Sequence, residues 1–253
     1  MVDIHTHILH GLDDGAPTLE ESVAMVRMAA ESGTTDIVAT PHANLHYAYR
    51  PELVDERIAE LTEAAAGTLR IHRGCDFHLY YENIQQAIEN PACFTINRKR
   101  YLLVEFSDVT ILDSAGQAFK RMLAGGTTPV ITHPERNPLL ARGLDQIMEW
   151  VADGCRVQVT ADSFLGRFGR RARAAATQLI ERNLVHFIAS DAHDTDQRSP
   201  VMDGAYRYIE REYGKAYAEA LFTDNPRAAL AGEEVSVATA EAGRGAASWW
   251  RWW

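Results

Sequence analysis

The feature that most constrains this chain is a regular alternation of short, β-branched apolar runs with longer stretches of helical periodicity. Seven runs have the length and composition of strands: 2–4, 36–39, 69–73, 101–104, 128–132, 156–159 and 185–189. The clearest helical stretches lie between and after them, at 19–30, 141–152, 170–182 and 201–211. Because each helix leads from one strand to the next, the strands are expected to run parallel.

The number of strand–helix units favours a barrel over an open sheet. No glycine-rich phosphate loop follows the first strand, as it would in a dinucleotide-binding sheet. A length of 253 residues suits one β/α barrel without division into domains. Thr18 and Glu21 form a capping-box pattern at the start of the first helix. The sequence therefore predicts an α/β fold, a seven-stranded, TIM-like barrel, closed or nearly closed, over residues 1–235.

Residues 236–253 are predicted to be a separate C-terminal tail. It begins with mostly small and polar residues and ends in Trp249-Trp250-Arg251-Trp252-Trp253. So many aromatic side chains are expected to seek apolar contact. Three interpretations stay open: the tail folds back on its own barrel, docks on a second copy in a homo-oligomer, or touches a membrane interface. None of them makes the tail catalytic.

Charge and composition exclude several classes of partner. The net charge of −10 is spread along the chain, which argues against nucleic-acid binding through phosphate contacts. No apolar run approaches the roughly 20 residues that span a bilayer, and no leader segment opens the chain. Cys75, Cys93 and Cys155 show no close-spaced pairing and are expected to be free thiols. We therefore expect a cytoplasmic protein without stable membrane insertion.

Histidines and carboxylates follow six of the predicted strands. They lie where barrel enzymes build their active sites, at the carboxyl ends of the strands. These residues are His5, His7, His42, Asp76, Glu105, His133, Asp191 and His193. Three further histidines, His10, His46 and His78, lie in loops at the same face and are candidates for substrate contacts.

The chemistry of these side chains indicates a transition-metal site. In His5-Thr6-His7 an extended backbone places both imidazoles on one side, where they can share an ion. The same geometry holds for Asp191 and His193 if the chain is extended there. Imidazole together with carboxylate suits Zn²⁺, Mn²⁺ or Fe²⁺ rather than Mg²⁺ or Ca²⁺. The sequence therefore predicts a metal-dependent hydrolase.

The motifs around these residues resemble a known superfamily. The matching segments are Asp3-Ile4-His5-Thr6-His7, Asp13-Asp14-Gly15, Thr40-Pro41-His42, Val104-Glu105-Phe106, Thr132-His133-Pro134-Glu135-Arg136, Leu165-Gly166-Arg167-Phe168-Gly169, Ser190-Asp191-Ala192-His193 and Asn225-Pro226-Arg227. Together they resemble the PHP (polymerase and histidinol phosphatase) superfamily. Within it they are similar to the bacterial manganese-dependent protein-tyrosine phosphatases of capsule and exopolysaccharide operons.

The resemblance implies a distorted seven-stranded barrel with two to three divalent ions, Mn²⁺ first and Fe²⁺, Zn²⁺ or Co²⁺ as alternatives. Carried over by motif, the three sets of metal ligands are His5, His7 and Asp191 with a shared Asp76; Asp76, Glu105 and His133; and Asp14, His42 and His193. The spacing from His7 favours Asp14 over the adjacent Asp13. The bridging position is usually Glu in the family, whereas here it is Asp76.

The resemblance also implies a reaction and a partner. A metal-bridging hydroxide attacks phosphorus, and Arg136 and Arg198 match family positions that hold phosphoryl oxygens, with His42 at the same catalytic centre. The implied substrate is a phosphotyrosine-bearing bacterial tyrosine kinase of polysaccharide biosynthesis.

Three other functions remain open at this stage. A small-molecule phosphatase of the histidinol phosphate type would use the same ions. A metal-dependent amidohydrolase also carries His-x-His on its first strand, but no strand end here offers the lysine that usually bridges its ions. The third is a weakly active or inactive barrel that serves as a regulatory binding protein, for which Asp76 is the main support.

Overall fold

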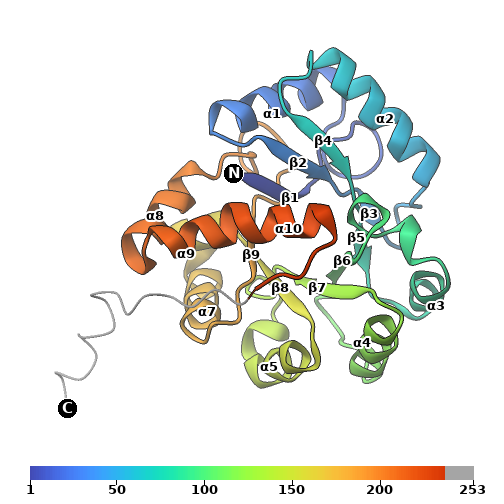
Figure 1. Ribbon diagram of the computed structural model, residues 1–253, viewed down its shortest axis with the longest axis vertical. Coiled ribbons are helices and arrows are strands. Elements are labelled where there is room, and N and C mark those ends of the chain that lie inside the picture. The colour runs from blue at the N-terminus through green and yellow to red at the C-terminus, as the bar shows by residue number, and fades with distance from the viewer. Residues whose placement is uncertain (237–253) are drawn as a thin grey trace.

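Parallel strands form the centre of the molecule (Figure 1). The structure is a computed structural model, and it describes residues 1–236. All seven predicted runs contain a strand, and two short strands appear in addition. The strands are β1 (Val2–Thr6), β2 (Asp36–Ala39), β3 (His42–Ala43), β4 (Arg70–Arg73), β5 (Asp76–His78), β6 (Tyr101–Glu105), β7 (Thr128–Thr132), β8 (Arg156–Thr160) and β9 (Phe187–Ala189).

These strands divide into two parallel sheets. One sheet has the order β1-β2-β4, and the other has the order β3-β5-β6-β7-β8-β9. The second and third predicted strands are each followed, after two residues, by one of the additional short strands: β2 by β3, and β4 by β5. Each of these chain segments therefore begins in the first sheet and ends in the second.

The predicted seven-stranded barrel, closed or nearly closed, is not confirmed, because the strands of the described part of the chain form two sheets and no closed ring. The two-residue gaps between these short strands contain Pro41, which has no N–H to donate to a ladder, and Gly74, where a Cβ would lie 2.7 Å from Val38 Cγ1. Where the sheets approach again, a single bridge joins Thr6 to Ala192 beyond β9. The Ala192 carbonyl accepts there from His7 N–H at 2.8 Å. The strand ends still converge at this seam, although no continuous ladder closes the ring.

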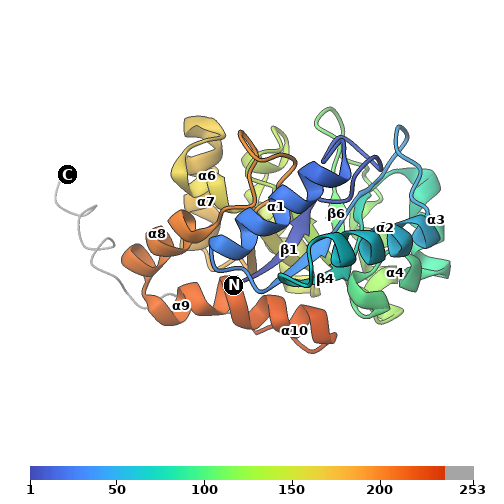
Figure 2. The same cartoon turned by 90° about the horizontal axis from the view of Figure 1, so that it is seen from above.

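Helices surround the sheets, as Figure 1 shows. They are α1 (Leu19–Glu31), α2 (Pro51–Ala64), α3 (Tyr81–Glu89), α4 (Ala115–Ala124), α5 (Leu144–Asp153), α6 (Ala161–Leu165), α7 (Gly169–Glu181), α8 (Asp203–Tyr213), α9 (Lys215–Glu219) and α10 (Asn225–Ala231). In Figure 2, α9 and α10 run on the side opposite to the loops that follow the strands.

None of the helices in the described residues is long and apolar enough to cross a membrane. All three cysteines are free.

The start of α1 is tied to the loop that follows β9. The Thr18 hydroxyl accepts from Glu21 N–H at 3.3 Å, which caps the helix as predicted. The Glu21 carboxylate accepts from Thr195 N–H at 3.1 Å and from the Thr195 hydroxyl at 2.7 Å. Thus α1 holds the loop that carries His193.

The last described residues pack against β1, β6 and α10. The Tyr101 hydroxyl donates to the Glu233 carbonyl at 2.7 Å and accepts from Val235 N–H at 3.1 Å. Val235 is buried in one core cluster with Val2, Ile4 and Ala229 of β1 and α10. The predicted tail, with its four tryptophans, lies outside the described residues from 237 onward.

Replacing Tyr101 by Phe should lower the free energy of unfolding by about 1–3 kcal/mol, because it leaves the buried Val235 N–H and the partly buried Glu233 carbonyl without their partner. Urea denaturation monitored by circular dichroism measures the change. Tyr81→Phe is the matched control, since Tyr81 is 80% exposed. Equal stability of the two variants would show that the Tyr101 hydroxyl does not stabilise the packing of residues 233–235.

Candidate metal centre

All nine predicted metal ligands come together at the carboxyl ends of the strands. They fall into four overlapping groups whose ligand atoms lie within 4.8 Å of one another: His7, Asp14, His42 and His193; His5, His7 and Asp76; His5, His133 and Asp191; and His42, Asp76 and Glu105. Groups that overlap in this way suit a cluster of neighbouring ions rather than one isolated ion.

The innermost part of the cluster is formed by the histidines of β1 and two carboxylates. His5 Nε2 lies 3.5 Å from both Asp76 Oδ2 and Asp191 Oδ1. His7 Nε2 lies 3.5 Å from Asp191 Oδ1 and 4.0 Å from Asp76 Oδ2. The extended backbone of β1 therefore places both rings on one side, as predicted, and both carboxylates can reach each ring.

The outer part of the cluster contains Asp14. Its Oδ1 lies 3.3 Å from His42 Nε2 and 3.6 Å from His193 Nε2. The adjacent Asp13 is engaged elsewhere: its Oδ2 contacts His7 Nδ1 at 2.7 Å and accepts from His42 N–H at 3.1 Å. This geometry favours Asp14, not Asp13, as the ligand.

The remaining ligands group differently from the family scheme. Glu105 Oε2 lies 3.5 Å from His42 Nδ1, and Asp76 Oδ2 lies 3.1 Å from the same nitrogen. His133 Nε2 lies 3.7 Å from Glu105 Oε1. However, the group of ligand atoms within 4.8 Å of one another that includes His133 is completed by His5 and Asp191, not by Asp76 and Glu105. Asp76 therefore lies between the groups, in the position of a bridging carboxylate.

Two of these residues have unusual backbone conformations. His133 has φ 32° and Asp191 has φ 53°, in the left-handed region that non-glycine residues rarely occupy. Strained conformations of this kind persist where the surrounding structure enforces them, often at functional sites. Here they coincide with the points where β7 and β9 give way to the loops of the cluster.

Polar neighbours orient the histidine rings. His5 Nδ1 contacts Gln158 Oε1 at 3.0 Å, and His193 Nδ1 contacts the Asp191 carbonyl at 3.1 Å. Together with the His7–Asp13 contact, these bonds hold Nδ1 as the donor and leave Nε2 free to bind an ion. The roles of Gln158 and Asp13 were not predicted. The available signal for Gln158 was a polar side chain within the apolar run of β8.

Asp13→Asn is expected to weaken divalent-metal binding about 10- to 100-fold, as loss of a partner that orients a ligand commonly does. The new amide puts a donor where the His7 ring needs an acceptor. Competition titration with a fluorescent chelator measures the affinity. Asp153→Asn, at a carboxylate paired with Lys120 at 3.3 Å outside the cluster, is the control. Unchanged affinity in the Asp13 variant would remove this role.

The donor set fits divalent cations. Asp76 is 0% exposed, and among residues 1–236 no donor makes a well-oriented hydrogen bond to either carboxylate oxygen, although Oδ2 lies 3.1 Å from His42 Nδ1. Burying a charged carboxylate without hydrogen bonds is costly unless a cation compensates it. Imidazole nitrogens of intermediate softness beside hard carboxylate oxygens match Mn²⁺, Fe²⁺ or Zn²⁺.

The electrostatics of the cluster support this reading. Burial alone would lower the pKa of His5, but Asp76 and Asp191 raise it to about 9. For His42 the effect of burial is likewise outweighed, because Asp14 and Asp76 raise its pKa to about 11. Protons thus compensate the carboxylates when no cation does. Because metal ions must displace these protons, the apparent metal affinity should rise with pH.

Two arginines border the cluster at Asp191. Arg198 Nη2 donates to Asp191 Oδ2 at 2.6 Å, and Arg136 Nη1 donates to the same oxygen. Both side chains are about a quarter exposed, at 22% for Arg136 and 27% for Arg198. The Arg136 guanidinium also lies over the Phe168 ring, 4.2 Å from its centroid. The predicted phosphate-binding arginines therefore lie together beside the ligands.

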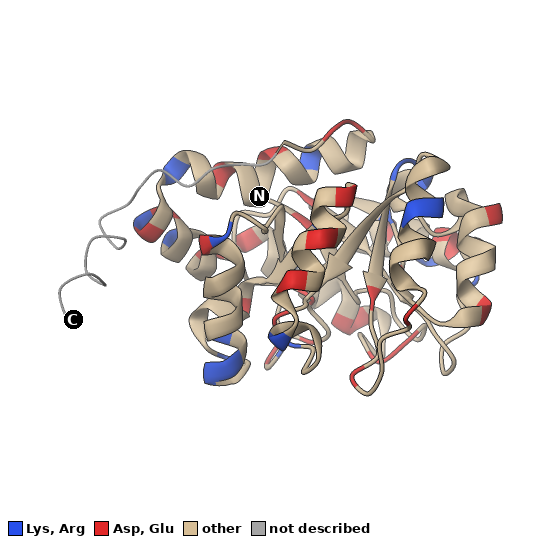
Figure 3. Cartoon of the chain, turned by 90° about the horizontal axis from the view of Figure 1, so that it is seen from below, with Lys and Arg blue, Asp and Glu red and all other residues tan. Residues whose placement is uncertain are grey.

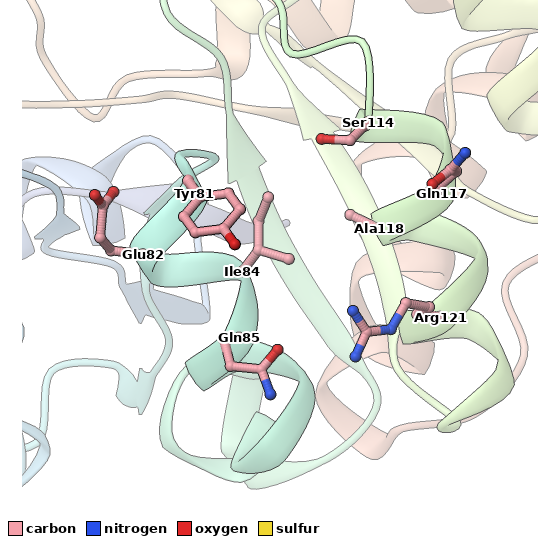
Figure 4. A pocket seen from close by; sticks show the side chains of 8 residues that line it. All are labelled: Tyr81, Glu82, Ile84, Gln85, Ser114, Gln117, Ala118 and Arg121. Atoms are coloured by element: carbon pink, nitrogen blue, oxygen red, sulfur yellow. The ribbon is translucent and has the colours of Figure 1, made fainter.

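The other predicted contacts are less close to the cluster. His78 Nδ1 lies 3.3 Å from Glu105 Oε2, so His78 borders it. His10 Nε2 lies 3.6 Å from the Glu60 carboxylate of α2, and the His46 backbone N–H donates to the Asn44 side chain. A hollow between α3 and α4, shown in Figure 4 with Tyr81 and Arg121 on opposite sides, contains none of the nine ligands.

Comparison with known proteins places these features in context. Residues 1–231 match the family described as capsular polysaccharide synthesis, CpsB/CapC. The chain is 36% identical over 243 residues to CapC of Staphylococcus aureus, covering 93% of both chains. It is 34% identical over 239 residues to the tyrosine-protein phosphatase CpsB of Streptococcus pneumoniae, covering 90% of this chain and 97% of the relative.

A solved structure gives the same result for the fold. The matching structure comes from a study of YwqE from Bacillus subtilis and CpsB from Streptococcus pneumoniae, which are described there as unique metal-dependent tyrosine phosphatases. The TM-score is 0.89 at 32% sequence identity, covering 95% of this chain and 98% of the other.

Proposed function

This chain belongs to the CpsB/CapC family of capsular polysaccharide synthesis, and we propose that its substrate is a phosphorylated bacterial tyrosine kinase of polysaccharide biosynthesis, met in the cytoplasm. The chain is a metal-dependent protein-tyrosine phosphatase, as its relatives are. The observation that carries the proposal is the convergence of nine ligand side chains with Arg136 and Arg198 at one end of the strands.

Two to three divalent ions, with Mn²⁺ first, would be held by the nine ligands named above. When bound, such ions lower the pKa of coordinated water and neutralise charge on phosphoryl oxygens. Asp76 would bridge them, because it lies within reach of both His5 and His42. Gln158 and Asp13 contact Nδ1 of His5 and His7, so that Nε2 of each ring would be available to an ion.

The arginines supply the other half of the phosphoryl site. Both guanidinium groups contact one oxygen of Asp191, so they lie against the cluster and can hold two phosphoryl oxygens as charge develops. Packing of Arg136 against Phe168 fixes its plane. His42, which lies beside both Asp14 and Glu105, is at the same carboxyl end of the strands.

The leaving group favours tyrosine among phosphorylated residues. A tyrosine hydroxyl has a pKa of about 10, far below that of an aliphatic alcohol. Its phenolate can depart with less help from a general acid. A site built from cations and arginines therefore suits phosphotyrosine.

The test is a side-by-side assay of the metal-loaded protein on p-nitrophenyl phosphate, a phosphotyrosine peptide, a phosphoserine peptide and histidinol phosphate, with Mn²⁺, Co²⁺ or Zn²⁺. We expect the phosphotyrosine peptide to have a kcat/KM at least about tenfold above the phosphoserine peptide and histidinol phosphate. A preference for histidinol phosphate would indicate a small-molecule phosphatase. No turnover with ions bound would indicate a regulatory binding protein.

A further inference from the structure

A groove lies beside the metal centre and shares Arg136 with it, while none of the nine proposed ligands lines the groove. It has a volume of about 630 Å³, within the range of ligand-binding pockets. Its walls come from the loop after β7, from Glu135 to Arg142, and from the first turns of α7. Arg136 belongs to both places, since it contacts Asp191 and also lines the groove. A substrate with its phosphoryl group at Arg136 therefore reaches the groove directly.

The groove carries positive charge in an acidic molecule. Arg136, Arg142 and Arg171 line it, whereas the chain as a whole has a net charge of −10. Figure 3 shows acidic segments on helices across the molecule. Within residues 1–236, no carboxylate lies within salt-bridge distance of Arg142 or Arg171. These two guanidinium groups are therefore available to a ligand.

The one acidic residue among the described lining residues is Glu135, and its charge is withdrawn from the groove. Glu135 is 2% exposed. One of its oxygens accepts from Thr160 N–H at 2.9 Å and from the Ser163 hydroxyl at 2.7 Å. Glu135 thus offsets little of the positive charge at the surface of the groove.

The floor of the groove is small and apolar. Ala141, Ala172 and Ala175 line it together with the Phe168 ring. Short side chains allow a peptide backbone to approach closely, while arginines at the rim can bind carboxylates in a two-pronged geometry. An apolar floor with a cationic rim fits a peptide segment with acidic side chains better than a compact sugar or amino-acid phosphate.

We propose that this arginine groove, formed by Arg136, Arg142, Arg171 and Phe168, binds acidic residues that flank the phosphotyrosine in the same substrate chain. The proposal rests on the proposed function, since it requires hydrolysis of phosphotyrosine in a peptide. The groove selects among phosphotyrosine substrates by charge, and the metal centre supplies the chemistry to all of them.

The test uses two phosphotyrosine peptides of equal length, one with Asp and Glu around the phosphotyrosine and one with Asn and Gln there. Metal-loaded wild type should have a kcat/KM about three- to tenfold higher on the acidic peptide, as two exposed ion pairs imply. In the double variant Arg142→Gln with Arg171→Gln, the two values should become nearly equal. The wild-type preference should also shrink as salt is raised.

Arg173→Gln is the matched control. It removes one arginine from the same helix, but the Arg173 guanidinium lies over Tyr208 of α8, 5.7 Å from the ring centroid. This variant should keep the acidic preference. Turnover of p-nitrophenyl phosphate, which has no flanking residues, should be unchanged in all variants, and thermal melts check their folding.

Two results would overturn the proposal while leaving the proposed function standing: wild type that hydrolyses both peptides equally well, or a double variant that keeps the full preference. A different result separates the two ideas. If wild type hydrolyses p-nitrophenyl phosphate but neither peptide, protein-tyrosine phosphatase activity fails, and the groove proposal fails with it.

Discussion

Asp191→Asn is expected to lower kcat on p-nitrophenyl phosphate by about 1000-fold or more. Asp191 is 2% exposed, and its two oxygens contact His5, His7, Arg136 and Arg198. Removing its charge therefore weakens metal binding and misplaces both arginines at once. Several kcal/mol of stabilisation at the transition state depend on such ions, and each 1.36 kcal/mol is tenfold in rate. Bound metal per chain should fall in the same variant.

Asp36→Asn serves as the matched control. Asp36 is also a buried carboxylate paired with an arginine, Arg70 at 2.6 Å, but it lies at the amino end of β2. This variant should keep its metal and its kcat, even if it loses stability. Near wild-type turnover in Asp191→Asn, with circular dichroism unchanged, would show that the ligand assignment is wrong.

Arg198→Ala is expected to lower kcat/KM about 100- to 1000-fold while the metal content stays at the wild-type level. The Arg198 guanidinium donates to the oxygen of Asp191 that Arg136 also contacts, and it would hold a phosphoryl oxygen during transfer. Loss of one preorganised donor to developing charge commonly has an effect of this size. The effect should appear chiefly in kcat, because the interaction strengthens in the transition state.

A matched control for this variant is Arg207→Ala. Arg207 pairs with Asp203 within α8, and its side chain is 68% exposed. Its replacement should leave both kcat and KM unchanged. If Arg198→Ala lost its metal together with its activity, Arg198 would be a support for the ligands rather than a group that binds phosphate.

The strands could be predicted because short runs rich in apolar and β-branched residues alternate along the chain with longer stretches of helical period. The division into two sheets could not, because it depends on β3 and β5, which have only two and three residues. Such short strands carry no periodicity of their own. They form beside Pro41 and Gly74. Which sheet they join depends on the strands with which they pair in the folded structure.

Eight of the nine proposed metal ligands could be placed together from the sequence, because they follow predicted strands and parallel strands bring their carboxyl ends together. Asp14 follows no predicted strand, and its assignment rests on the resemblance. The groups that orient them could not be identified in this way. Gln158 lies within a strand, and its contact with His5 joins residues that are 153 positions apart. The arginine groove could not be predicted from the sequence for the same reason. Arg142 and Arg171 line one groove because α7 packs beside the loop after β7.

The most direct measurement titrates metal-free protein with Mn²⁺ while recording bound metal and phosphotyrosine hydrolysis together. The account predicts that metal-free protein is folded and inactive. It also predicts that activity appears as ions bind, and that binding saturates at two to three ions per chain. Full activity in protein shown by elemental analysis to hold no transition metal would contradict the central claim. Saturation of the metal sites without any hydrolysis would contradict it equally.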